Sequence, residues 1–101
     1  MGASPAYLLT PAARDDIGEV WLYIAGENPS SADALEDEFF AAFERLTVKP
    51  DLGHWRRDLT DKPVRFFTVR RQYLVVYVPG TQPLEIIRVL HGARDAGPLL
   101  E

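Results

Sequence analysis

The sequence predicts an α+β domain in which a helical hairpin packs on one face of an antiparallel sheet, in the order β-α-α-β-β-β. In the first half of the chain, apolar residues recur every three or four positions, as on the buried side of a helix. The second half instead holds runs rich in β-branched and aromatic residues, joined by short links. A chain of 101 residues, 47% hydrophobic and 26% charged, suits one folded core, so we expect residues 1–101 to form a single domain.

The first element is a short strand from Tyr7, preceded by residues 1–5, which we expect to be flexible. Thr10 can accept a hydrogen bond from the first free N–H groups of a helix, and Pro11 suits the first turn. The apolar stripe that follows predicts a helix that ends before Gly26. Its members are Ala13, Ile17, Val20, Trp21 and Ile24.

A second helix begins by the same device, with Asn28 as the cap and Pro29 in the first turn. Its stripe consists of Ala32, Leu35, Phe39, Phe43 and Leu46. Acidic residues crowd the first half of this helix, and Arg45 and Lys49 lie near its end, which complements the helix dipole. Because few residues separate the two helices, an antiparallel hairpin is the simplest arrangement.

Three strands are predicted after a polar loop at 51–63. They run from Val64 to Val69, from Tyr73 to Val78 and from Leu84 to Leu90. The short links between them force neighbouring strands to be antiparallel. We expect the hairpin to cover one face of the sheet, the other face to be at least partly open, and residues 96–101 to form a tail.

The composition excludes several kinds of site. The absence of cysteine rules out disulfides, thiol nucleophiles and thiolate metal sites. His54 and His91 lack the spacing of a zinc site, so we expect no metal and no cofactor. No stretch has the length and apolar character of a membrane span, and the first residues do not resemble a signal peptide. A cytoplasmic protein is therefore expected.

The net charge of −4 is unevenly distributed along the chain. Residues 1–50 hold nine acidic and three basic residues, whereas residues 64–94 hold five arginines and a single acidic residue, Glu85. Two interpretations follow. The protein has two ordinary solvated faces, or its sheet half carries a positive patch for an acidic partner.

Arg88 interrupts an otherwise apolar strand. Alternation predicts that it shares one face with Ile86 and Leu90. A buried, unpaired cation is costly, so Arg88 either forms a salt bridge with an acidic residue of the hairpin or the tail, such as Asp95, or faces a ligand. Close by, His91 can act as an acid or base near neutral pH, or serve as a cap or packed edge residue.

The segment RVLHGARD at 88–95 resembles the C-terminal signature of ParE toxins, which belong to the RelE/ParE superfamily of bacterial toxin–antitoxin modules. Further matches occur in the family order, so the resemblance runs from Tyr7 to Asp95. They are Tyr23-Ile24, Asn28-Pro29, Pro50 with Gly53, and YLVVY at 73–77. The resemblance implies the fold predicted above. It also implies a toxin held in a hetero-oligomer by a ParD-like antitoxin, as in modules for plasmid stabilisation.

Two branches of the superfamily share this fold, and the resemblance implies different roles in each. ParE-like members trap DNA gyrase on cleaved DNA by binding it, and here the candidate target-binding residues are Arg88, His91 and Arg94, with the tail at 96–101. RelE-like members cleave mRNA on the ribosome, and for this activity the candidate catalytic residues are Arg65, Arg88, His91 and Arg94. A third alternative is an inactive member that only binds protein.

The charge distribution favours the gyrase branch. The whole chain has only Lys49 and Lys62 to supplement its arginines, and its net charge opposes docking into a polyanionic ribosome. The one strand carboxylate, Glu85, alternates onto the face opposite Arg88. A gyrase poison requires no covalent chemistry of its own.

The helices carry more aromatic side chains than a core stripe needs. We expect Trp21 and Phe43 to lie in the core, whereas Tyr23 and Phe40 lie beside or at the border of the stripe. If exposed, they form part of a groove for an antitoxin helix. Tyr23 and Phe40 are therefore the candidate antitoxin-binding residues.

Overall fold

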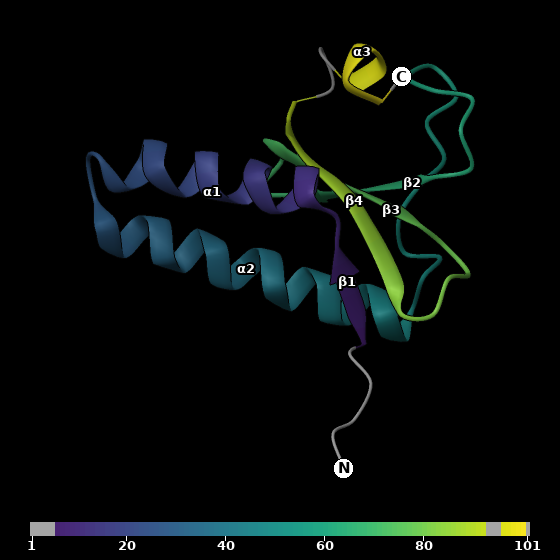
Figure 1. The fold of residues 1–101 in the computed structure, drawn as a ribbon, viewed down its shortest axis with the longest axis horizontal. Coiled ribbons are helices and arrows are strands. Elements are labelled where there is room, and N and C mark those ends of the chain that lie inside the picture. The colour runs from purple at the N-terminus through teal and green to yellow at the C-terminus, as the bar shows by residue number, and fades with distance from the viewer. Residues whose placement is uncertain (1–5, 93–95, 101) are drawn as a thin grey trace.

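The computed structural model describes residues 6–92 and 96–100 of the chain (Figure 1). Residues 1–5, which we expected to be flexible, lie outside the described residues. The elements in order are β1 (Tyr7–Leu9), α1 (Pro11–Ala25), α2 (Pro29–Val48), β2 (Arg65–Val69), β3 (Tyr73–Val78), β4 (Leu84–His91) and α3 (Ala96–Leu100). The predicted α+β class is confirmed, and every predicted helix and strand is present. Among the described residues, no helix combines the length and the apolar character that crossing a membrane requires.

The four strands form one sheet in the order β1-β4-β3-β2. The meander of β2, β3 and β4 is antiparallel, as the short links predicted. β1 adds a parallel pair with β4, in which Leu8 lies opposite Glu85, so the sheet is mixed rather than wholly antiparallel. The hairpin links β1 to β2 at the far edge of the sheet, and the meander then brings β4 back beside β1.

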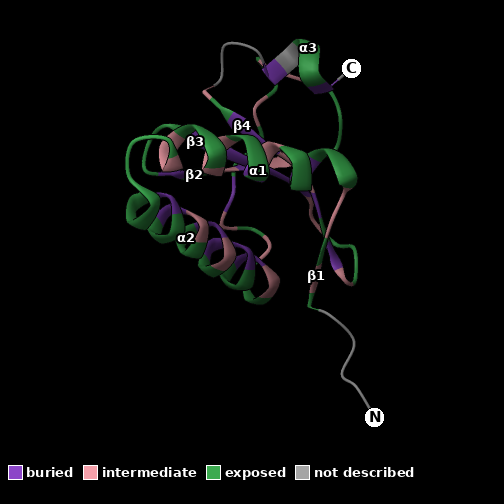
Figure 2. Cartoon of the chain, turned by 60° about the vertical axis from the view of Figure 1, so that its left-hand side comes forward, coloured by how far each residue is buried: buried purple, intermediate pink, exposed green. Residues whose placement is uncertain are grey.

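The two long helices begin where their caps predicted. The Thr10 hydroxyl accepts a hydrogen bond from the N–H of Ala13 at 3.1 Å, and the Asn28 side chain accepts one from the N–H of Ser31 at 3.2 Å. Both helices lie on one face of the sheet, and their buried sides face it (Figures 1 and 2). The main core fills this space, and its largest fully buried members are Leu35, Phe39, Phe43, Leu46, Val75, Tyr77 and Ile86.

Trp21 corrects one expectation about this core. Its side chain is half-buried instead of enclosed, and its indole N–H donates to a carboxylate oxygen of Asp33 on α2 at 2.9 Å. The fully buried positions of α1 are Ala13 and Ile17. An indole that reaches a partner at the surface of the hairpin satisfies its donor without burial.

The second face of the sheet is less open than predicted. A smaller apolar cluster lies there, and it contains Val64, Phe66, Leu74, Val76 and Leu90. The tail covers it by forming α3, whose Ala96 and Leu100 are buried in the same cluster. The ammonium of Lys62 donates to the carbonyl of Leu100 and so holds the end of this short helix in place.

A β-bulge in β4 corrects the predicted alternation around Arg88. Tyr77 of β3 pairs with Ile86, but its neighbour Val76 pairs with Arg88, so Ile87 is an extra residue. As a result Ile86 joins the core under the hairpin, whereas Ile87 packs with the cluster on the second face. Ile86 therefore does not share a face with Leu90, because the inserted residue reverses the alternation.

Candidate functional site

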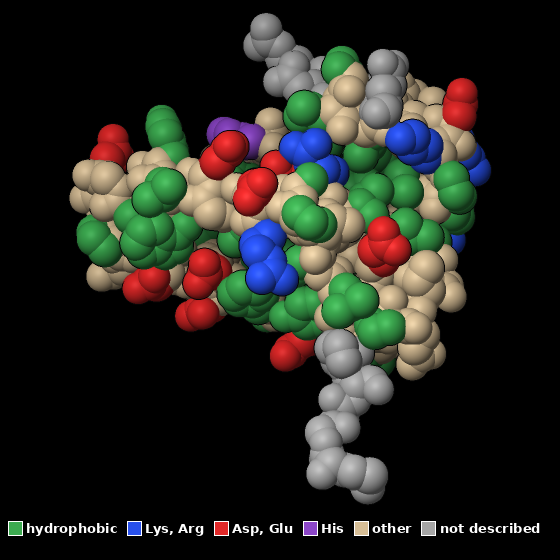
Figure 3. Space-filling view, viewed as in Figure 1, with side chains coloured by type: hydrophobic (Ala, Val, Ile, Leu, Met, Phe, Trp, Pro, Cys, Tyr) green, Lys and Arg blue, Asp and Glu red, His purple; other side chains and the backbone are tan. Residues whose placement is uncertain are grey.

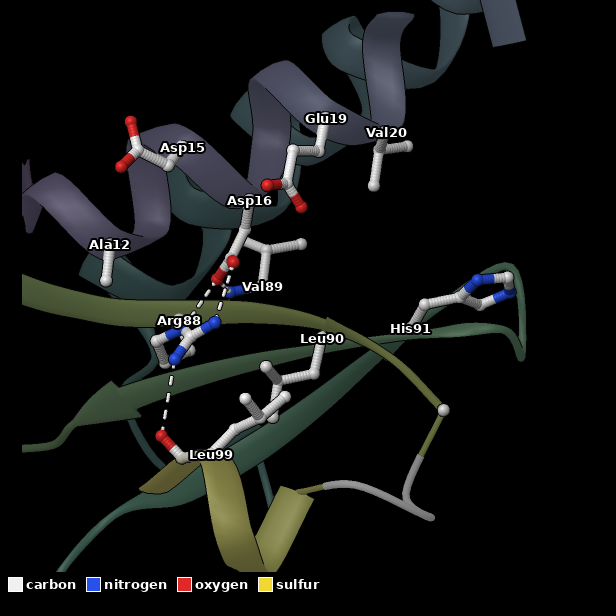
Figure 4. Close-up of a pocket in the computed structure, with 11 residues that line it drawn as sticks. Ala12, Asp15, Asp16, Glu19, Val20, Arg88, Val89, Leu90, His91 and Leu99 are labelled. Atoms are coloured by element: carbon white, nitrogen blue, oxygen red, sulfur yellow. Dashed lines mark hydrogen bonds and ion pairs between the residues drawn. The ribbon is translucent and has the colours of Figure 1, made fainter. Parts of the chain in front are cut away.

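An open cleft of about 510 Å³ lies between α1, the second half of β4 and α3 (Figure 4). Helix α1 contributes Ala12, Asp15, Asp16, Glu19 and Val20. Strand β4 and the turn after it contribute Arg88, Val89, Leu90, His91 and Gly92, and α3 contributes Leu99. The cleft therefore contains two of the three residues predicted to bind the target, Arg88 and His91. The third, Arg94, lies outside the described residues.

Arg88 is held at the wall of the cleft by Asp16 of α1. Its Nε donates to one carboxylate oxygen at 2.7 Å and its Nη2 to the other at 2.8 Å, a bidentate pair (Figure 4). The Arg88 side chain is 21% exposed and the Asp16 side chain is 12% exposed. The same carboxylate accepts the backbone N–H of Val89 at 2.9 Å, and Nη1 of Arg88 donates to the carbonyl of Leu99 at 3.2 Å.

This geometry decides between the two interpretations of Arg88. The partner is an acidic residue of the hairpin, as the salt-bridge interpretation predicted, while Asp95 lies outside the described residues. The hydrogen bond to Asp16 raises the pKa of the Arg88 guanidinium, with smaller Coulombic contributions from Asp16 and Glu19. Arg88 therefore joins α1, β4 and α3 as a fixed cation that shapes the cleft.

His91 lies at the end of β4 and is exposed. Its ring stacks on Tyr73 of β3, with 4.9 Å between centroids and 26° between planes. Burial raises the pKa of the Tyr73 hydroxyl. Gly92 follows at a positive φ of 86°, a conformation that glycine adopts without strain, and the chain turns away from the sheet there.

Arg65 lies outside the cleft. It is the first residue of β2, which β3 separates from β4. Its guanidinium donates to the carbonyl of Gly53 at 2.7 Å and lies 4.5 Å from the centre of the Trp55 ring. Of the four residues considered for RNA cleavage, only Arg88 and His91 thus line the same cleft within the described part of the chain.

Most arginines of the predicted positive patch already have internal partners. Arg88 pairs with Asp16, Arg70 pairs with Glu38, and Arg65 bonds to the backbone of the loop. Acidic and basic side chains also alternate on the face around the cleft (Figure 3). Within residues 6–92 and 96–100, no three His, Cys, Asp or Glu side chains converge as ligands for one metal ion. The interpretation as ordinary solvated faces fits these contacts better than a continuous patch.

The two candidate antitoxin-binding residues differ in exposure. Tyr23 is 82% exposed, and beside it Leu22 is 68% exposed at the end of α1. Phe40 is half-buried and packs edge-on against Phe43, with 5.9 Å between ring centroids. Sequence reasoning missed Leu22, although its place outside the apolar stripe was a usable signal.

Sequence reasoning also missed the acidic wall of the cleft. Asp16 lies on α1 next to the buried Ile17, and Glu19 follows at the next helical turn. The need of Arg88 for a partner was the available signal, since it pointed to an acidic residue of the hairpin. It did not indicate which of the nine acidic residues in positions 1–50 is that partner.

Comparison with known proteins identifies relatives of this fold. Residues 7–96 match the model of a family described as ParE toxin of type II toxin-antitoxin system, parDE. A solved structure described as the chromosomal ParDE TA system from P. aeruginosa is similar, with a TM-score of 0.67 and 18% sequence identity. The similarity covers 84% of this chain and 92% of that one, and at this identity it concerns the fold. No curated protein matches the sequence.

Proposed function

Since the family model matches nearly the whole chain, this protein belongs to the ParE toxins of type II toxin–antitoxin systems, and we propose on that premise that it inhibits DNA gyrase by binding. In this proposal the toxin binds more tightly to the enzyme with cleaved DNA than to its other states, so the cleaved state accumulates. No covalent chemistry by the toxin is needed. A cognate ParD-like antitoxin neutralises it in a cytoplasmic hetero-oligomer.

The observation that carries this proposal is the acidic wall beside Arg88 and His91. Asp15, Asp16 and Glu19 line the same cleft, and carboxylates repel the phosphates that an RNA-cleaving site must hold. Arg65, the further cation considered for RNA cleavage, is engaged elsewhere. Both facts support a surface that binds protein over one that cuts mRNA.

The predicted target-binding residues take different roles in this proposal. Arg88 acts as a positioning residue, because its guanidinium is committed to Asp16 and to the carbonyl of Leu99. His91 and the exposed Leu99 contact the target directly. Arg94 stays in the proposal as a further contact from the segment between β4 and α3.

The antitoxin occupies a second surface in this proposal, at the end of the helical hairpin. Tyr23 and Leu22 offer apolar area to a partner helix there. Phe40, the other candidate, lies further along α2, where it is half-buried against the core, and it is proposed as a separate contact of the antitoxin. Tyrosine is among the residues that contribute most to protein interfaces. The acidic side chains of the hairpin surround this area and favour a partner with basic residues.

The test is gyrase supercoiling and DNA cleavage with the purified full chain. We expect inhibition of supercoiling and accumulation of linear plasmid at micromolar toxin, both reversed by the cognate antitoxin. A folded protein that changes neither reaction at that concentration would reject gyrase as the target. Induction of the toxin alone in growing cells adds a second readout, in which DNA synthesis stops before protein synthesis.

The mRNA alternative has its own assay. Translating ribosomes are incubated with the purified chain, and cleavage in the ribosomal A site is mapped on the mRNA. Cleavage that disappears in the His91→Ala variant would replace the gyrase proposal with the endonuclease. If neither assay responds and cells grow normally on induction, the chain is a member that only binds protein.

A further inference from the structure

The second half of β4 is an edge with no strand beside it in the described part of the chain. β1 pairs with β4 only along 84–86. The N–H of Thr10 then donates to the carbonyl of Ile86 at 3.1 Å and its hydroxyl to that of Ile87 at 2.7 Å, after which the chain enters α1. β1 thus leaves the edge of the sheet where the cleft begins.

The backbone of this edge faces the cleft. Val89 donates its N–H to Asp16 and not to β3, so its backbone groups point away from the meander. In an antiparallel ladder, residues two apart point to the same side, and His91 therefore presents its N–H and its carbonyl to the cleft as well. The described residues offer no partner to these two groups or to the carbonyl of Val89.

The walls of the cleft suit an extended peptide. α1 lies on one side and Leu99 of α3, 47% exposed, on the other, and the volume between them is about 510 Å³ (Figure 4). Asp15 and Glu19 are exposed on α1, and neither forms an ion pair within the described residues. The cleft therefore combines a free strand edge with two exposed carboxylates that can pair with cations of a partner.

We propose that an extended segment of the protein target adds to the free edge of β4 as a further strand, with a lysine or arginine against Glu19 and Asp15. This inference rests on the proposed function, in which the target is DNA gyrase, and it names the mode of contact. Main-chain hydrogen bonds to Val89 and His91 supply affinity, and the acidic wall supplies specificity for a basic side chain. The bonds of Asp16 to Arg88 and to the N–H of Val89 hold this edge beside α1.

Nucleic acid is a poorer occupant of the same cleft. Two of the three free backbone groups are carbonyls, which need donors, and a phosphate offers none. The carboxylates on α1 repel phosphate as well. A peptide supplies both donors and acceptors along its backbone.

The first test compares two substitutions at His91 in the full chain with purified gyrase holoenzyme. His91→Pro removes the N–H that faces the cleft and leaves the bonds to β3 intact, whereas His91→Ala removes only the imidazole. Affinity for gyrase, measured by biolayer interferometry, should fall about tenfold further in the proline variant than in the alanine variant. Circular dichroism and urea unfolding establish that both are folded.

The second test reverses one charge without touching the strand. Glu19→Lys should weaken gyrase binding about tenfold, and the matched Asp37→Lys on α2 should change it less than about twofold. Suppose that the wild-type protein inhibits gyrase, but that the two His91 variants have equal affinity for it and the two charge-reversal variants do as well. Strand addition is then wrong, and the proposed function stands. If Glu19→Lys binds more tightly, DNA held by gyrase enters the cleft, which also overturns the inference. If wild type itself does not bind gyrase, the proposed function fails.

Discussion

The cleft beside β4 and the far end of the helical hairpin are built in opposite ways. In the cleft, the charged side chains of Arg88 and Asp16 satisfy one another and are only 21% and 12% exposed. At the end of α1, Leu22 and Tyr23 are 68% and 82% exposed, and within the described residues their side chains form no hydrogen bond or ion pair. The cleft thus offers fixed geometry, and the hairpin end offers apolar area that a partner can bury.

This difference separates two kinds of recognition. A partner of the cleft gains from hydrogen bonds to positions that are already set, so disturbing the internal ion pair should affect folding and binding together. A partner of the hairpin end gains from burying apolar surface that is mostly exposed in the free toxin. Substitutions there should affect binding alone.

The largest effect is expected from Asp16→Ala. The change leaves Arg88 partly buried without its carboxylate and removes the acceptor of the Val89 N–H, so the free energy of unfolding should fall by about 2–3 kcal/mol. Urea unfolding followed by circular dichroism measures it. The matched control is Glu38→Ala, which breaks the exposed pair with Arg70 and should cost less than about 1 kcal/mol. Equal losses of unfolding free energy in the two variants would show that the pair of Arg88 and Asp16 stabilises the fold no more than an exposed pair does.

A smaller effect on a different property is expected from Tyr23→Ala. Antitoxin affinity should fall by about tenfold, because a large aromatic contact area is removed from the interface. The free energy of unfolding should change by less than about 0.5 kcal/mol, since this side chain is mostly exposed. Isothermal titration with the cognate antitoxin and urea unfolding give both numbers. Unchanged affinity would place the antitoxin elsewhere and remove the contrast between the two regions.

How far the sequence predicts each region depends on the range of the interactions involved. The caps at Thr10 and Asn28 act within three residues, and both were predicted correctly. The partner of Arg88 lies 72 residues away in the sequence. No feature of residues 84–90 predicts the β-bulge in β4. Helix α3 has only five residues, which is too short for an apolar periodicity that would predict it. Its place depends on burial of Ala96 and Leu100 and on two cations at its carbonyl end.

Tyr73 connects the two regions and allows the smallest of the three predicted effects. Its ring packs edge-on against Phe39 under the hairpin and carries His91 on the cleft side. Burial raises the pKa of its hydroxyl above the value of about 10 in an unfolded chain. The neutral hydroxyl therefore contributes stability that is fully present below pH 10 and is lost as the pH rises through the folded-state pKa.

The predicted outcome is a difference in slope above pH 10. In wild type the free energy of unfolding should fall as the hydroxyls of Tyr7, Tyr73 and Tyr77 ionise, because burial raises the pKa of all three. In Tyr73→Phe one of these groups is missing, so the decline should be shallower, while the ring that supports His91 remains. Urea unfolding between pH 8 and about 11 measures both slopes. Parallel curves would mean that Tyr73 ionises as readily in the folded chain as in the unfolded one, and that burial does not raise the pKa of its hydroxyl.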